Sequence, residues 1–228
     1  MTTIASLLRE GTAEKHRETE QVPYMKAIFR GGLDPQTYTN QLVNLLHVYT
    51  LMEALFTKHK ADPIVSQVYF PELFRENSLK EDIQFFQKQF GTKVNPEITP
   101  ATQAYKSHIQ KIADTQPALL VAQSYVRYLG DLSGGQIIKK MIVKSFGLTG
   151  SDGTAFYEFP DIADHNAFKG MYREKMDTLP MNESEIQNLI SEAKITFDLN
   201  KNLFQELDSD LKQNLGIEKY EELFQRGN

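Results

Sequence analysis

Cysteine is absent from all 228 residues of this chain. Its absence excludes disulfide bonds, thiolate metal sites, a cysteine nucleophile and any cofactor attached covalently through cysteine. Long apolar runs are also lacking: no window approaches the roughly 18 apolar residues of a membrane-spanning helix, and the apolar stretch at the N-terminus is too short for a signal peptide. We therefore expect a soluble protein, and an intracellular, reducing compartment is compatible with this composition.

An excess of positive charge is missing as well. The chain has 25 Lys and Arg against 30 Asp and Glu, a net charge of -5, and 40% of its residues are hydrophobic. Proteins that bind nucleic acid usually carry a basic excess, so we expect no nucleic-acid partner. The length suits one domain with a single core, spanning residues 1–228.

Apolar residues recur at intervals of three and four, which is the helical period. Helix-end signals agree: Asp34 and Pro35 are typical of a helix start, Ser78-x-x-Glu81 of a capping box, and Gly91 and Gly147 of C-terminal caps. No run alternates as a strand does, and no internal repeat or linker is present. The sequence predicts an all-α, single-domain fold. The expected helices cover residues 3–20, 35–60, 78–90, 100–114, 117–146, 164–177 and 182–207, and the expected glycine- and aromatic-rich loop covers 149–161.

The segment RYLGDLSGGQIIKK, residues 127–140, places three glycines in an otherwise helical run. Each glycine costs a helix about 1 kcal/mol relative to alanine. The string LSGGQ also occurs in nucleotide-binding cassettes, but there it accompanies a phosphate-binding G-x-x-x-x-G-K-[ST] loop, which this chain lacks. Gly130 and Gly134 would share one helix face, which predicts either close packing against another backbone or a surface for a broad, flat ligand. Gly134 and Gly135 together favour a kink.

His16 and Glu20 are one helical turn apart. A carboxylate at this spacing can orient one ring nitrogen while the other binds a metal. A solvated or merely paired histidine is the common alternative, and His47, next to an apolar stripe, is the rival candidate for a ligand. A carboxylate-bridged di-iron site is not expected, because no histidine has Glu three residues before it.

Three segments together closely resemble the haem oxygenase family: LREGTAEKH at residues 8–16, VYFPEL at 68–73 and SYVRYLGDLSGGQIIKK at 124–140. The resemblance extends from about residue 7 to 207. It implies a helical fold that holds haem between a proximal helix with the axial histidine and a kinked distal helix containing the glycines. It also implies an enzyme for which haem is both cofactor and substrate. The implied reaction uses dioxygen to open haem to biliverdin, ferrous iron and carbon monoxide.

The resemblance assigns roles on both sides of the haem. On the proximal side His16 matches the iron ligand and Glu20 its hydrogen-bonding partner. On the distal side Asp131 matches the residue that organises a water network beside dioxygen. The alternative is that Arg127 and Asp131 form a plain surface ion pair. The other matched distal positions are Gly130 and Gly134, which bring backbone close to the haem, and Tyr49 and Arg127, further members of the polar network.

The resemblance also assigns the edge and lining of the haem site. The positions that match propionate-binding residues are Arg9, Tyr125, Lys169 and Arg173; Arg9 replaces the lysine of familiar members. This set favours attack at the α-meso carbon. Phe197, Asn200 and Phe204 match positions that line the pocket. A solvated helix face is the alternative for the charged residues, and simple core packing for the aromatic ones.

No flavin or nicotinamide fingerprint occurs in the sequence, so the implied reaction needs an external electron donor such as a ferredoxin or a flavin reductase. Membrane-bound members carry a C-terminal apolar anchor, whereas the tail at 208–228 ends EELFQRGN. We expect no membrane partner and a cytoplasmic bacterial or plastid-stroma location. Three alternatives stay open: a haem sensor or carrier, which would need His16 but not Asp131; an interaction protein without haem; and a thiaminase-like hydrolase, which would want the missing cysteine.

Overall fold

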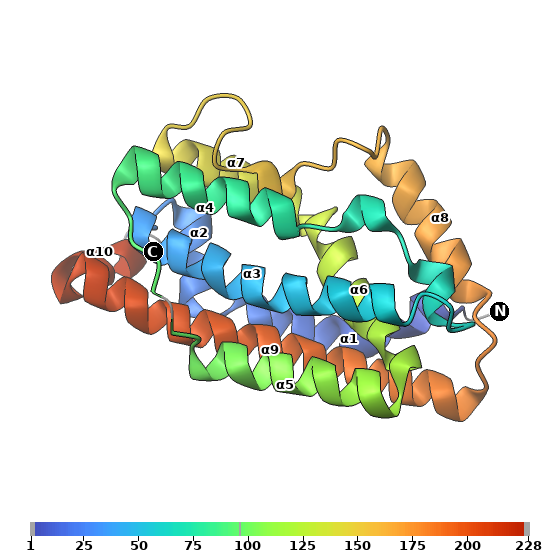
Figure 1. Cartoon of the computed structure of the whole chain (residues 1–228). Coiled ribbons are helices and arrows are strands. Elements are labelled where there is room, and N and C mark those ends of the chain that lie inside the picture. The colour runs from blue at the N-terminus through green and yellow to red at the C-terminus, as the bar shows by residue number, and fades with distance from the viewer. Residues whose placement is uncertain (1–2, 96, 226–228) are drawn as a thin grey trace.

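The computed structural model describes residues 3–95 and 97–225. Within these ranges the chain forms α-helices and short 3-10 turns and no strand, which confirms the all-α prediction (Figure 1). The α-helices are α1 (Ile4–Glu20), α2 (Pro23–Arg30), α3 (Pro35–Lys58), α4 (Glu76–Phe90), α5 (Pro100–Thr115), α6 (Leu120–Asp131), α7 (Gly134–Phe146), α8 (His165–Asp177), α9 (Glu183–Leu215) and α10 (Ile217–Gln225). The 3-10 turns are η1 (Val65–Val68), η2 (Pro71–Leu73), η3 (Pro117–Leu119) and η4 (Ala155–Tyr157).

Helix α9 is the element around which the others are arranged. It is 33 residues long and packs against α1, α2, α3, α5, α6 and α10. In Figure 1 α1, α3, α5 and α9 run along the long dimension of the molecule, while α6 crosses behind α3 at a steep angle. Since α1 and α6 both pack on α9, the two helices that carry the histidine and the glycines share one support.

The core is rich in large aromatic side chains. Tyr24, Tyr38, Tyr49, Tyr105 and Tyr128 all have almost no exposed surface. Each buries a broad ring and brings one hydroxyl into the interior, where it needs a hydrogen-bond partner. Polar groups therefore reach the centre of an otherwise apolar bundle.

Two of the predicted helix-end signals are confirmed. The Asp34 side chain accepts a hydrogen bond from the Thr37 amide at 2.9 Å, and Pro35 is the first residue of α3. Gly91 and Gly147 follow the last residues of α4 and α7 in the left-handed region, with φ of 67° and 62°. Glycine adopts this conformation without a steric penalty, which explains why both helices stop there.

The predicted capping box at Ser78 is wrong, because α4 begins at Glu76 and Ser78 lies inside it. A tertiary contact replaces the local cap: the buried Glu53 carboxylate of α3 accepts the Arg75 amide at 2.5 Å and the Glu76 amide at 3.4 Å. This contact satisfies donors at the start of the helix that a neighbouring side chain would otherwise have to satisfy.

Three other boundaries differ from the prediction. Helix α2 was not predicted, since its eight residues are too short for a clear period, although Pro23 opens it and Gly31 closes it at φ 69°. Helix α9 continues to Leu215 instead of ending near 207, and residues 217–225 of the expected tail form α10. Helix α10 is tied back to α2, because Arg30 donates to the Leu223 carbonyl at 2.8 Å.

The expected helix over residues 117–146 is divided into η3, α6 and α7. Residues Leu132 and Ser133 separate α6 from α7, so the kink is a complete break. The prediction that Gly130 and Gly134 lie in mid-helix is therefore wrong: Gly130 is the penultimate residue of α6 and Gly134 the first of α7.

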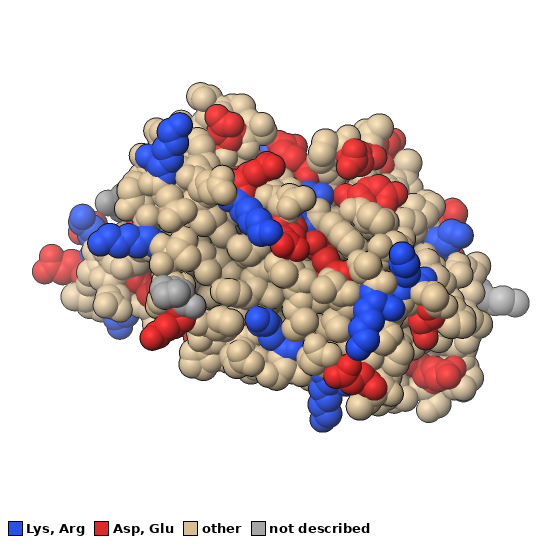
Figure 2. Space-filling model, in the orientation of Figure 1, with Lys and Arg blue, Asp and Glu red and all other residues tan. Residues whose placement is uncertain are grey.

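On the face drawn in Figure 2, acidic and basic side chains are interspersed and do not gather into a patch of one sign. In residues 3–95 and 97–225 no helix is long and apolar enough to cross a bilayer.

Candidate functional site

His16 lies near the end of α1 with its side chain 58% exposed. Its Nδ1 is 3.6 Å from Oε2 of Glu20, a distance that allows electrostatic pairing but is too long for a hydrogen bond. The Phe197 ring of α9 meets the imidazole edge to face, with ring centroids 5.7 Å apart. The imidazole is thus supported from one side and open to solvent elsewhere.

Four charged side chains fix α1 against α9 around this histidine. Lys15 is 2.9 Å from Asp198, and Lys201 is 2.7 Å from Glu18 and 3.1 Å from Asp198. Lys15 directly precedes His16 on α1, and Asp198 directly follows Phe197 on α9, whereas Glu18 lies on another face of α1 from His16. The pairs therefore hold α1 against α9 at the level where His16 contacts Phe197.

The glycines at the α6–α7 break have different surroundings. A Cβ added to Gly130 or Gly134 would meet nothing within 4 Å, and both residues are exposed. Close packing against another backbone is therefore the wrong interpretation for these two. At Gly135 an added Cβ would lie 3.2 Å from the Tyr157 ring, so this glycine alone of the three is packed. The break presents bare backbone to open space on one side and is packed on the other.

Asp131 is buried directly before this break, with 7% of its surface exposed. Tyr49 of α3 donates its hydroxyl hydrogen bond to Oδ2 of Asp131, and Arg127 Nε donates to the Tyr49 oxygen at 2.9 Å. Arg127 Nη2 also lies 3.6 Å from Oδ1 of Asp131. The side chains of Arg127 and Asp131 are only 11% and 9% exposed, so the surface ion-pair interpretation is wrong.

Burial raises the pKa of Asp131, while the Arg127 charge, the Tyr49 hydrogen bond and the Arg75 charge oppose the shift. Burial also raises the pKa of Tyr49 well above its ordinary value, which keeps its hydroxyl protonated and able to donate. The cluster therefore holds a carboxyl group whose proton is easier to retain than that of a solvated aspartate.

Several residues of this cluster were not predicted from the sequence. Arg75 is buried and its charge acts on Asp131; Glu53 accepts the Arg75 amide; and the Tyr128 hydroxyl is buried with no hydrogen-bond partner in the described structure. One signal was available, because Glu53 stands one turn after Tyr49 beside the apolar stripe of α3. Arg75 lies between two helices and gives no periodic signal.

The four candidate propionate-binding residues come from three helices. Arg9 is exposed on α1, Tyr125 is half-buried on α6, and Lys169 and Arg173 are one turn apart on α8. Burial raises the pKa of Tyr125, and the charges of Arg173 and Arg9 oppose that shift. Arg9, Tyr125 and Arg173 therefore lie within electrostatic reach of one another.

The three candidate lining residues on α9 have separate surroundings. Phe197 contacts His16 as described. Asn200 is 3% exposed, and its Oδ1 accepts a hydrogen bond from Arg127 Nη1 at 2.5 Å. Phe204 stacks on Tyr24 of α2 with centroids 5.9 Å apart, the contact that the core interpretation predicts. Because Phe197 and Asn200 are three residues apart, His16 and Arg127 border neighbouring positions on one face of α9.

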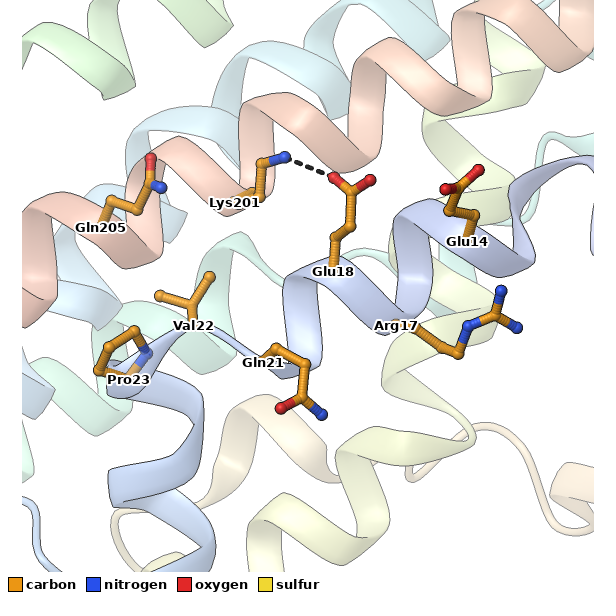
Figure 3. Close-up of a pocket in the computed structure, with 8 residues that line it drawn as sticks. All are labelled: Glu14, Arg17, Glu18, Gln21, Val22, Pro23, Lys201 and Gln205. Atoms are coloured by element: carbon orange, nitrogen blue, oxygen red, sulfur yellow. Dashed lines mark hydrogen bonds and ion pairs between the residues drawn. The ribbon is translucent and has the colours of Figure 1, made fainter. Parts of the chain in front are cut away.

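A groove of about 610 Å³ lies on another face of α1, between this helix, the α1–α2 turn and α9 (Figure 3). The spacing of its α1 residues places it away from His16 and Glu20. Its lining residues are Glu14, Arg17, Glu18, Gln21, Val22, Pro23, Lys201 and Gln205.

Comparison with known proteins gives consistent results. The family model described as Heme oxygenase matches residues 2–206. A heme oxygenase of Rhodella violacea is 42% identical over 217 residues, which are 95% of this chain and 92% of that protein. Heme oxygenase 1 of Synechocystis sp. is 42% identical over 225 residues, 98% of this chain and 92% of that protein.

Solved structures agree with the sequence comparison. The crystal structure of heme oxygenase-1 from the cyanobacterium Synechocystis sp., in complex with heme, superposes with a TM-score of 0.89 at 42% identity, covering 97% of this chain and 99% of that one. The heme oxygenase of Leptospira interrogans gives a TM-score of 0.85 at 44% identity, covering 90% of this chain and all of that one. Family match, identity and fold agree over nearly the whole chain, and the chain belongs to the haem oxygenase family of enzymes.

Proposed function

We propose that this enzyme binds haem between α1 and the α6–α7 break, with His16 on one side and Gly130 and Gly134 on the other, and opens it to biliverdin, ferrous iron and carbon monoxide. The observation that carries the proposal is the open space over the two glycines. A pair of side-chain-free positions beside a buried polar cluster suits a flat ligand that must approach the backbone closely.

The residues present fit haem. His16 offers an exposed imidazole that Phe197 supports, and Glu20 lies where its charge favours Nδ1 as the protonated nitrogen, so that Nε2 is the nitrogen suited to bind iron. The solved Synechocystis relative is described as a complex with heme, which supports the same ligand here.

When bound, haem supplies a redox-active iron and is itself the ring that is oxidised. A neutral histidine ligand does not push electron density towards the iron as a thiolate does. Burial raises the pKa of the Asp131 carboxyl group, and Tyr49 and Arg127 hold that group in one orientation. These residues can supply a proton through water to the place where dioxygen would bind, without placing a strong acid there.

The cationic edge orients the substrate. Arg9, Lys169 and Arg173 provide positive charge and Tyr125 a hydroxyl for the two propionates. Anchoring the propionates fixes the rotation of the ring, and so decides which meso carbon lies beside the distal cluster, the group formed by Tyr49, Arg127 and Asp131. We infer that the α carbon is attacked and that biliverdin is the α isomer.

Reducing equivalents come from a separate protein, for which a ferredoxin or a flavin reductase is suited. The cyanobacterial relatives support a cytoplasmic or plastid-stroma location, where such donors are available.

The test is an absorption time course of the purified protein with one equivalent of haem, an electron donor and air. Loss of the Soret band with growth of a biliverdin band is the expected result. A Soret band that stays constant under effective reduction would overturn the proposal and favour a haem sensor or carrier. Chromatography of the product against the four biliverdin isomers tests the α assignment.

A further inference from the structure

Two rows of polar side chains face each other between α6 and α9. Each row repeats every four residues, so its members lie on one face of their helix. We call the six residues the polar seam: Gln123, Arg127 and Asp131 on α6, and Glu192, Thr196 and Asn200 on α9.

Hydrogen bonds close one half of the polar seam. Gln123 Nε2 donates to Glu192 Oε1 at 2.9 Å and to Thr196 Oγ1 at 2.8 Å. The Thr196 hydroxyl donates to the Glu192 carbonyl at 2.9 Å. Glu192 and Thr196 are therefore held together through both their side chains and the α9 backbone.

The other half joins this group to the distal cluster. Asn200 Nδ2 donates to the Thr196 carbonyl at 2.8 Å, and Asn200 Oδ1 accepts from Arg127. Arg127 in turn donates to Tyr49, which donates to Asp131. Hydrogen bonds, with one step through the covalent structure of Thr196, thus connect Glu192 to Asp131.

The polar seam is buried, which makes its charges costly unless they are paired. Gln123 and Thr196 have no exposed surface, and Asn200 and Glu192 are 3% and 4% exposed. Asp131 has Arg127 as its charge partner. Glu192 has His108 of α5, whose Nε2 lies 2.7 Å from Glu192 Oε1.

His108 is where this chain of contacts reaches solvent, because its side chain is 24% exposed. Histidine is also the side chain whose ordinary pKa, about 6.5, lies in the physiological range. We infer that His108 is a positioning residue for the distal site: a proton gained or lost by the His108–Glu192 pair changes the polar seam as far as Arg127 and Asp131. Its meaning for catalysis rests on the proposed function, whereas the coupling itself does not.

The side-chain amide of Gln123 can take two orientations. Its Oε1 is buried with no hydrogen-bond partner in the described structure, while its Nε2 donates to Glu192. An ionised carboxylate can only accept, but a protonated one can donate. On protonation of Glu192 the Gln123 amide can therefore rotate and present Oε1 to it. Thr196 then no longer accepts from Nε2, and its hydroxyl can donate either to Oε1 or to the Glu192 carbonyl.

The surrounding charges are compatible with this coupling. Burial raises the pKa of Glu192, and His108 and Gln123 oppose that shift through their contacts with it. The other titratable group facing Glu192 is Tyr105 of α5, whose pKa burial raises to about 12, so it stays neutral through the physiological range. From α6 the facing residue is the neutral Gln123.

The coupling can be measured by NMR on the haem-free protein. The Arg127 Nε–H signal, assigned with Arg127→Lys, is followed from pH 8 to pH 5 together with the His108 ring signals. We expect the Arg127 signal to shift in step with the His108 ring signals. In His108→Gln, which keeps a donor but does not titrate there, that step should disappear, and Glu192→Gln should remove it as well.

His47→Gln is the matched control, since His47 lies on α3 near Lys106 and outside the polar seam. It should keep the step. A wild-type Arg127 signal that does not follow His108, or an unchanged step in His108→Gln, would overturn the inference. If a variant does not fold, the inference is tested by the wild-type protein alone, in which the Arg127 signal either follows the His108 signals or does not. The haem-bound enzyme adds a second readout: the pH dependence of kcat should change in His108→Gln while KM for haem is unaffected.

Discussion

At the scale of single residues, Asp131 illustrates what a buried carboxyl group requires. Little of its surface is exposed to water, so protein donors and charges must satisfy most of its hydrogen-bonding capacity. Tyr49 reaches it from α3, Arg127 from the preceding turn of α6, and Arg75 contributes charge from the start of α4. Because each contribution comes from a different segment, loss of one is not compensated locally.

Tyr49→Phe breaks two hydrogen bonds at once, the one to Asp131 and the one from Arg127. Leaving buried polar groups unpaired costs about 1–3 kcal/mol, so the unfolding free energy of the haem-free protein should fall by about that amount in urea titrations. Tyr128→Phe is the matched control, because it removes a buried hydroxyl that has no partner in the described structure. Its effect should stay below about 1 kcal/mol; equal losses in both variants would contradict the assigned network.

His16→Ala removes the only imidazole supported by Phe197 among the described contacts. Haem should still bind through the cationic edge and the apolar walls, but without the absorption spectrum of an axial histidine, and turnover should be lost. The measurement is the ferric and ferrous spectrum with a parallel biliverdin assay. His47→Ala, on α3, is the comparison variant and should retain both. Full activity of His16→Ala would refute its role as ligand.

At the scale of helices, the sequence predicts most of the elements but not the tertiary contacts that set their ends. Periodicity identifies α1, α3, α5 and α8 closely, since each presents one apolar face. It does not identify the start of α4, because Glu53 caps that helix from α3. It also misses the Arg75 and Glu192 contacts, which join residues far apart in sequence. The glycines predict a distortion, but they predict neither that Leu132 and Ser133 separate two helices nor that Gly135 packs against Tyr157.

Gly130→Leu separates the ligand role of the break from its structural role. An added side chain meets nothing within 4 Å of its Cβ, so the unfolding free energy of the haem-free protein should not fall. Haem affinity and biliverdin formation should drop sharply, because the side chain occupies the space proposed for haem and dioxygen. Gly135→Leu is the contrasting variant: its side chain meets Tyr157, so it should destabilise the haem-free protein by about 1–3 kcal/mol. Normal haem turnover in Gly130→Leu would contradict the proposed site.

At the scale of the whole molecule, buried carboxyl groups tie distant segments to one another. Glu53 joins α3 to α4, and Asp82 of α4 accepts the amides of Ala155 and Phe156, both at 2.8 Å, which fixes η4. Phe156 and Tyr157 of η4 then pack against Tyr49 and Gly135. The distal cluster therefore depends on a carboxyl group that lies outside it, and the stability of the fold should depend on pH through such groups.

Burial raises the pKa of Asp82 from 3.8 to about 7 and that of Glu53 from 4.5 to about 7. At a pH between the ordinary and the raised pKa of each group, the folded protein keeps a proton that the unfolded chain has lost. The stability contributed by each protonated group is thus complete below its ordinary pKa and falls as pH rises towards 7, by at most about 1.4 kcal/mol per pH unit.

Urea unfolding of the haem-free protein at pH 5, 6, 7 and 8 tests this dependence. Asp82→Asn should be less stable than the wild type, because only one amide atom can accept a hydrogen bond, but its stability should fall less steeply between pH 5 and 7. Other carboxyl groups contribute equally to both proteins, so the difference between the two curves isolates Asp82. The exposed Asp152, replaced in Asp152→Asn, is the control and should leave the slope unchanged. Parallel curves for Asp82→Asn and the wild type would mean that Asp82 is already ionised in the folded protein, and that its two amide hydrogen bonds outweigh the effect of burial.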